Sequence, residues 1–233
     1  MIDITWLGHA TYTLRLSSGE VILIDPWIDG NPSYPKDYKL DRVDVILVTH
    51  GHGDHITNVI PLAKEFSPQV VANFETSVWL EKKGVKNVVG MNKGGTTKVG
   101  PISVTMTHAV HSNSITEEDG TVIYGGEPAG FVVKLPDRRS VYCAGDTGVF
   151  SDMQLIARLY HPELAFLPIG DFYTMGPKEA ALAVQMLDVR KIIPVHWGTF
   201  PVLTGRPEKV AELLVNHPNN EVWTLEPGKT VQW

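Results

Sequence analysis

Three histidines and an aspartate stand within six residues of one another, directly after an apolar run at residues 43–48. The string is His50-x-His52-x-Asp54-His55, and the run before it is mostly β-branched, which favours a strand. His50 and His52 are two residues apart, so in an extended turn both imidazole rings can face one metal ion. Asp54 and His55 lie across the turn and can reach a second ion. The sequence predicts a metal-binding loop, with a solvated histidine-rich turn as the alternative.

Further histidines and an aspartate come at the ends of later strand-like runs, as a complete site requires. They are His108 and His111 after the run 102–107, Asp146 after the run 140–144, and His196 after the run 191–194. Taken alone, Asp146 is more readily interpreted as an aspartate that caps a turn. The glycines on both sides of it, however, would let the backbone approach a metal closely.

These motifs carry a resemblance to a known family. The chain resembles the metallo-β-lactamase superfamily of metal-dependent hydrolases in the order of its motifs, which are His50-x-His52-x-Asp54-His55, His111, Gly145-Asp146-Thr147 and Val195-His196-Trp197. The chain opens with Trp6-Leu7-Gly8-His9-Ala10-Thr11, which is similar to the opening motif of the branch that contains ascorbate-6-phosphate lactonase and N-acylphosphatidylethanolamine phospholipase D. Within that branch, the chain resembles the small metal-dependent hydrolases most. The motifs span nearly the whole chain, and they are specific for the fold and the metal site but not for the substrate.

The resemblance implies an α/β (α+β) protein with the four-layer αβ/βα sandwich of that superfamily, in a single hydrolase domain over residues 1–233. Alternating strand-like and helix-like patterns along the chain agree with this expectation. The resemblance also implies two divalent metal ions per chain. The expected ligands are His50, His52 and His111 for one ion, Asp54, His55 and His196 for the other, and Asp146 between the two.

Nitrogen and oxygen ligands suit zinc, and manganese or iron would also be accepted. Two such ions would lower the pKa of a water between them and supply hydroxide for hydrolysis, which Asp54 could help to orient. Lactam-cleaving relatives commonly carry cysteine in the site, so β-lactamase activity is not expected. The alternative functions are a nuclease or RNA-processing phosphodiesterase, and a mononuclear iron enzyme that uses oxygen on the same fold.

Three residues near the ligands are expected to support the site. In relatives, an aspartate at the position of Asp25 braces the metal loop without binding metal. His111 is preferred to His108 as a ligand because the histidine of the superfamily comes a few residues past the strand end, which leaves His108 a supporting or packing role. His9 is either a packed histidine or a catalytic residue that protonates a leaving group or holds the substrate.

Aromatic and apolar residues follow two of the candidate strand ends. Trp27 follows one of them, and Phe172, Tyr173 and Met175 stand in a loop after the run 164–168. We expect these four side chains to border the site and contact the substrate, although a surface loop or a packed βα connection would contain the same residues. An apolar rim around a metal centre favours a compact substrate, such as a small ester, lactone or phosphodiester.

A polar segment at residues 112–126 follows His111 and carries the acidic run Glu117-Glu118-Asp119 at its centre. Its polarity and its glycines predict a mobile hairpin. Since it follows a ligand, the hairpin is a candidate lid over the site.

The composition restricts the partners and the compartment. The net charge is −6 and the basic residues are scattered, so a nucleic-acid partner is not expected. No apolar run approaches the roughly 20 residues of a membrane span. The single cysteine, Cys143, lies in an apolar strand-like run and excludes an internal disulfide. These features predict a cytoplasmic protein that acts on a small molecule, and they do not indicate an oligomeric state.

Overall fold

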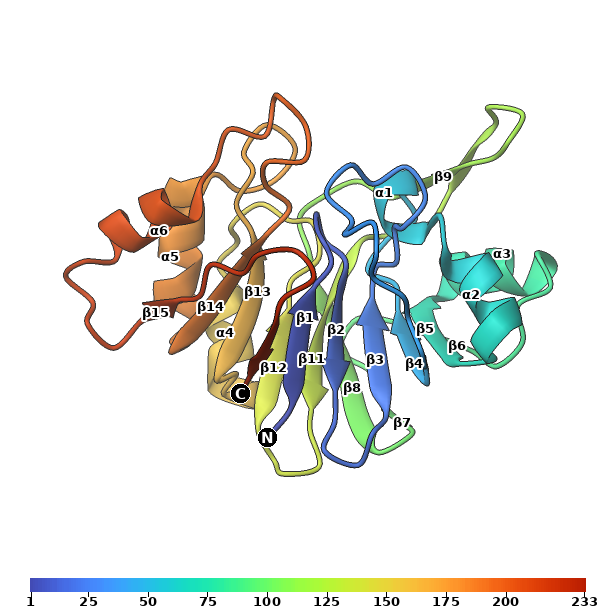
Figure 1. The fold of residues 1–233 in the computed structure, drawn as a ribbon, viewed down its shortest axis with the longest axis horizontal. Helices are drawn as coiled ribbons and strands as arrows, with labels where there is room; N and C mark the ends of the chain where they lie inside the picture. Colours follow the sequence, from blue (N-terminus) through green and yellow to red (C-terminus); the bar gives the residue numbers. More distant parts are fainter. The chain divides into compact units, whose positions relative to one another are not determined.

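The computed structural model describes residues 1–233, and the chain divides into two compact units. Unit 1 consists of Met1–Asn92, Ser112–Pro128 and Glu226–Trp233, and unit 2 consists of Lys93–His111 and Ala129–Leu225. Each unit is built on its own seven-stranded sheet, and all of these strands except β16 are labelled in Figure 1. The single domain expected over residues 1–233 remains a prediction.

The sheet of unit 1 has the strand order β16-β1-β2-β3-β4-β5-β6. Its strands are β1 (Asp3–Trp6), β2 (Tyr12–Arg15), β3 (Val21–Ile24), β4 (Val45–Leu47), β5 (Gln69–Asn73), β6 (Val88–Met91) and β16 (Thr230–Gln232). Strands β1 to β3 form an antiparallel meander, and β3 to β6 are parallel to one another. Because β1, β3 and β4 point the same way, their carboxyl ends lie at one edge of this sheet.

Three helices belong to unit 1, namely α1 (Gly53–Ile56), α2 (Val59–Phe66) and α3 (Phe74–Lys82). Helices α2 and α3 bury Leu62 and Leu80 in a cluster with the strand residues of the sheet. Helix α1 is separated from α2 at residues 57 and 58. The Asn58 N–H donates to the carbonyl of Pro26, and its side-chain oxygen accepts the N–H of Ile28 at 2.7 Å, so hydrogen bonds to a segment about 30 residues earlier replace a helical turn.

The segment 112–126 is a hairpin, as expected, formed by antiparallel β9 (Ser114–Thr116) and β10 (Val122–Tyr124). The carboxylate of Glu117 accepts hydrogen bonds from Lys83 Nζ at 2.6 Å and from Trp79 Nε1 at 2.8 Å. These bonds hold the pKa of Glu117 below its ordinary value and fasten the hairpin to α3. They do not favour the mobile lid that the sequence suggested.

The sheet of unit 2 has the strand order β15-β14-β13-β12-β11-β8-β7. Its strands are β7 (Thr96–Val99), β8 (Ile102–His108), β11 (Ala129–Lys134), β12 (Ser140–Cys143), β13 (Leu164–Pro168), β14 (Lys191–Val195) and β15 (Glu221–Val222). Strand β11 is antiparallel to both of its neighbours, β8 and β12, and β12 to β15 are parallel. The carboxyl ends of β8, β12, β13 and β14 therefore lie at one edge of this sheet.

Helices α4 (Met153–Tyr160), α5 (Pro177–Leu187) and α6 (Pro207–Leu213) pack on the sheet of unit 2. They bury side chains such as Ile156, Val184 and Val210 with Tyr142 and Leu167 of the strands. Helix α5 begins at a proline, which suits a first helical position that needs no N–H donor. None of the helices in either unit combines the length and the apolar character that crossing a bilayer requires.

Candidate metal centre

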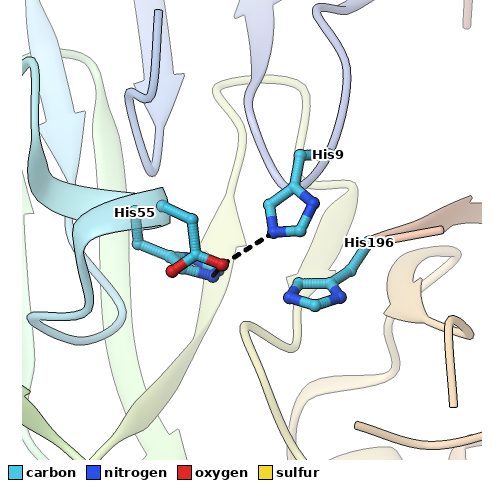
Figure 2. Close-up of side chains that lie close together, drawn as sticks. His9, His55 and His196 are labelled. Atoms are coloured by element: carbon cyan, nitrogen blue, oxygen red, sulfur yellow. Dashed lines mark hydrogen bonds and ion pairs between the residues drawn. The ribbon is translucent and has the colours of Figure 1, made fainter. Parts of the chain in front are cut away.

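The candidate residues of unit 1 follow three strands that point the same way. His9 follows β1 and Asp25 follows β3, whereas residues 49–55, the last three of which lie in α1, follow β4. Residues far apart in the sequence therefore meet at one edge of the sheet. His9, Asp54 and His55 each offer one possible ligand atom, and these three atoms lie within 4.8 Å of one another. Figure 2 shows the His9 and His55 rings close together.

Asp25 orients the metal loop through three hydrogen bonds. Its Oδ1 accepts the N–H of Thr49 at 2.8 Å, and its Oδ2 accepts the Thr49 hydroxyl at 2.7 Å. The same Oδ2 lies 2.9 Å from Nδ1 of His55. An ionised carboxylate can only accept, so Nδ1 of His55 carries the proton and the lone pair of that ring lies on Nε2.

The Thr49 hydroxyl extends this constraint to His50. Its proton goes to Asp25, so its oxygen accepts from Nδ1 of His50 at 3.0 Å. The lone pair of His50 then lies on Nε2, which is 3.0 Å from Nδ1 of His52. Two imidazoles thus direct a ring nitrogen at the same place, as two ligands of one ion do.

His9 is fully buried, and its Nε2 lies 3.0 Å from Oδ2 of Asp54, the contact that is dashed in Figure 2. Its ring packs edge-on against Trp27, with the ring centroids 5.0 Å apart. Trp27 is itself only 8% exposed. His9 is thus placed to orient Asp54, and Trp27 packs against His9, while the substrate contacts expected for the two residues stay predictions.

The backbone of this cluster is strained. His9 and Asp25 have φ angles of 52° and 45°, in the left-handed region that costs a residue other than glycine about 1–2 kcal/mol. Neighbouring side chains hold both turns. The Trp6 indole N–H donates to the carbonyl of His9 at 2.9 Å, and the Thr11 hydroxyl donates to the carbonyl of Asp25 at 2.7 Å. The conformation that turns these two residues toward the loop is therefore built into the opening motif.

In unit 2, three residues from different strand ends come together. His111 follows β8, Asp146 follows β12, and His196 follows β14 directly. Oδ2 of Asp146 lies 3.0 Å from Nε2 of His196 and 3.7 Å from Nε2 of His111. A carboxylate has about four lone-pair sites and can serve two partners at once. Asp146 is almost completely buried, and His196 also has a positive φ, of 54°.

His108 lies outside this cluster. It is the last residue of β8 and is exposed, with Nδ1 3.1 Å from the Lys93 Nζ and its ring edge-on to Phe150. Neither contact involves a candidate ligand, so the supporting role expected for His108 is not retained. The structure places His111 beside Asp146 instead.

Asn113 is a residue that the sequence did not single out. Its Oδ1 accepts the N–H of Gly51 at 2.7 Å, and its Nδ2 donates to the carbonyl of Gly125 at 2.7 Å. Gly51 stands between His50 and His52, so Asn113 fixes the backbone between two candidate ligands and ties it to the base of the hairpin. A lone asparagine gives no signal of such a contact in a sequence.

Comparison with known proteins identifies the family. The profile of the beta-lactamase superfamily domain matches residues 20–197. The chain belongs to the metallo-β-lactamase superfamily. A protein named UPF0173 metal-dependent hydrolase from Solibacter usitatus is 62% identical over 232 residues, which cover 100% of both chains. The chain is thus a metal-dependent hydrolase of this superfamily.

Solved structures agree with this assignment. Igni18, a metallo hydrolase from Ignicoccus hospitalis, has a TM-score of 0.86 at 32% identity and covers 99% of this chain and 97% of its own. CmlA, a diiron β-hydroxylase from Streptomyces venezuelae, has a TM-score of 0.75 at 16% identity and covers 100% of this chain and 54% of its own. The second likeness concerns the fold alone. The predicted metallo-β-lactamase-like α/β fold is confirmed.

The donors that the two units present fit divalent metal ions. All are imidazole nitrogens or carboxylate oxygens, which zinc, manganese and iron accept. In unit 1 the bonds to Asp25 and Thr49 place the lone pairs of His55 and His50 on Nε2. Metal-binding histidines have this arrangement, in which the second ring nitrogen donates to an oxygen.

The contact made by Asn113 predicts an effect on metal affinity. Asn113→Ala removes the bond that holds Gly51, so the affinity for zinc should fall by about 10–100-fold, as for other residues that orient ligands. A chelator-competition titration measures this change. Asn220→Ala, which removes a side-chain bond to the carbonyl of Val189, is the control and should keep the wild-type affinity. Equal affinities of both variants and the wild type would refute the role of Asn113.

The two histidines near the end of β8 should differ sharply in the same titration. His111→Ala removes a candidate ligand beside Asp146 and should weaken metal binding by more than about 100-fold, beyond the usual loss of an orienting residue. His108→Ala removes an exposed ring that contacts no candidate ligand and should change the affinity by less than about tenfold. The opposite ranking would reassign the ligand to His108.

Proposed function

We propose that this hydrolase binds two divalent metal ions per chain, most simply zinc, and cleaves a small ester, lactone or phosphodiester. The observation that carries the proposal is the convergence of donors at one sheet edge in each unit. The proposed ligands are His50, His52 and His111 for one ion, Asp54, His55 and His196 for the other, and Asp146 for both. These seven side chains exceed the needs of one four-coordinate ion, which favours two ions.

Two divalent ions held by these residues would lower the pKa of a bound water and polarise the bond to be cleaved. The side chains of the protein prepare this chemistry. Asp25 and Thr49 hold the imidazoles of His55 and His50 in the tautomers that bind metal. His9 holds one carboxylate oxygen of Asp54, so that the carboxylate can orient the attacking water in a fixed direction. We therefore assign His9 to positioning Asp54.

Charge supports the proposal of a small substrate. The chain has a net charge of −6, whereas binding to a nucleic-acid backbone depends on clustered lysine and arginine. A compact substrate needs no extended basic surface, because a metal centre can hold its polar reacting group directly.

The experiment is a turnover panel with protein that has been stripped of metal and reloaded with zinc, manganese or iron. The substrates are small lactones, carboxylic esters and bis-aryl phosphodiesters, with tRNA precursors and single-stranded oligonucleotides beside them. We expect hydrolysis of at least one small substrate, lost on chelation and restored by metal. Asp146→Ala should lower kcat by more than the roughly 10–100-fold cost of losing an orienting residue.

The control variant is Asp152→Ala, which removes an exposed aspartate before α4 and should retain full activity. Cleavage confined to the nucleic acids would replace the proposal with a nuclease. Oxygen consumption by the iron-loaded protein, with no hydrolysis of any substrate, would replace it with an oxygen-using enzyme.

A further inference from the structure

A loop of unit 2 presents two aromatic side chains to solvent. It connects β13 to α5, and in it Phe172 and Tyr173 are 68% and 54% exposed. Their rings pack edge-on with the centroids 4.7 Å apart. Large apolar side chains that stay together in water call for an explanation in terms of binding.

Both ends of this loop are attached to the backbone beside candidate metal ligands. At its start, Gly170 packs so closely on His196 that an added Cβ would lie 2.1 Å from the His196 carbonyl oxygen. At its end, the Met175 N–H donates to the carbonyl of Thr147, the residue after Asp146, at 3.1 Å. The positions of the two aromatic residues are thus tied to the two turns that carry Asp146 and His196.

The loop also holds two consecutive residues in the left-handed region. Asp171 and Phe172 have φ angles of 67° and 61°, and for a bulky residue such as phenylalanine this is a true outlier. Helix ends account for left-handed residues such as Ser67 and His161, but no helix ends here. Residues held in such conformations cluster at active sites, ligand clamps and switch regions.

Hydrogen bonds within the loop maintain the strained conformation. The Asp171 N–H donates to the Met175 carbonyl at 3.0 Å, and the Tyr173 N–H donates to the Asp171 carbonyl at 2.7 Å. The Asp171 side chain accepts the N–H of Phe172 at 2.8 Å. The aromatic pair is therefore presented by a closed turn, and its exposure is a fixed feature of the loop.

We propose that Phe172 and Tyr173 determine specificity by packing on a flat apolar group of the substrate, about one aromatic ring in size, next to the bond that is cleaved. This inference rests on the proposed function, because it takes Asp146 and His196 as part of the reacting centre. Met175, which the sequence grouped with the aromatic pair, is 2% exposed in the core of unit 2. It anchors the loop and does not contact the substrate.

The test uses two metal-binding probes that differ only in their apolar group, acetohydroxamate and benzohydroxamate. Their binding to zinc-loaded protein is measured by calorimetry. The wild type should prefer benzohydroxamate by about two- to tenfold, the size of one aromatic contact. In the double variant Phe172→Ala, Tyr173→Ala the preference should disappear, while the affinity for acetohydroxamate and the metal content stay unchanged. Tyr173→Ala alone tests the same point if the double variant does not fold.

Two variants serve as controls. Phe74→Ala removes another exposed aromatic side chain, from α3 of unit 1, and should leave the preference intact. Tyr173→Phe keeps the ring and should also retain it. Equal binding of the two probes to the wild type, or a preference that survives in the double variant, would overturn the inference and leave the proposed function standing. Failure of both probes to bind the zinc-loaded wild type would overturn the proposed metal centre itself.

Discussion

The carboxylate of Asp25 is the group on which the metal loop depends. It is buried to 1% exposure in a left-handed turn, and it satisfies both of its oxygens with the N–H and hydroxyl of Thr49 and with Nδ1 of His55. A buried charge without such partners would be very unfavourable. Through Thr49 the same carboxylate also sets the protonation of His50. One buried aspartate thus decides which nitrogen two histidines offer.

Strand direction explains why the other candidate residues come together. In each unit, strands that are separated in the sequence run the same way, so the residues after them share an edge of the sheet. Such an edge is where α/β proteins place their ligands. The glycines allow close packing around it: a Cβ on Gly51 would lie 2.4 Å from Ile115 of the hairpin. The fold thereby supplies several donors without any long-range sequence signal apart from the strand ends.

Sequence alone predicts the parts of this arrangement that are encoded locally. The spacing of His50 to His55 and the strand ends before His111, Asp146 and His196 are local patterns, and the family resemblance that they carry implied the correct fold class. Other features depend on groups that are distant in the sequence. They are the burial of His9 and Met175, the break between α1 and α2 at Asn58, and the contact of Asn113 with Gly51. No pattern within one segment contains that information, so these features required the structure.

The central claim is that seven side chains bind two metal ions per chain. Anomalous X-ray scattering from crystals of the zinc-loaded protein, recorded on both sides of the zinc absorption edge, tests it most directly. The account predicts two anomalous peaks per chain, about 3.5–4 Å apart, with Asp146 in contact with both. A single peak at full zinc loading, or peaks bound by side chains outside the proposed set, would contradict it.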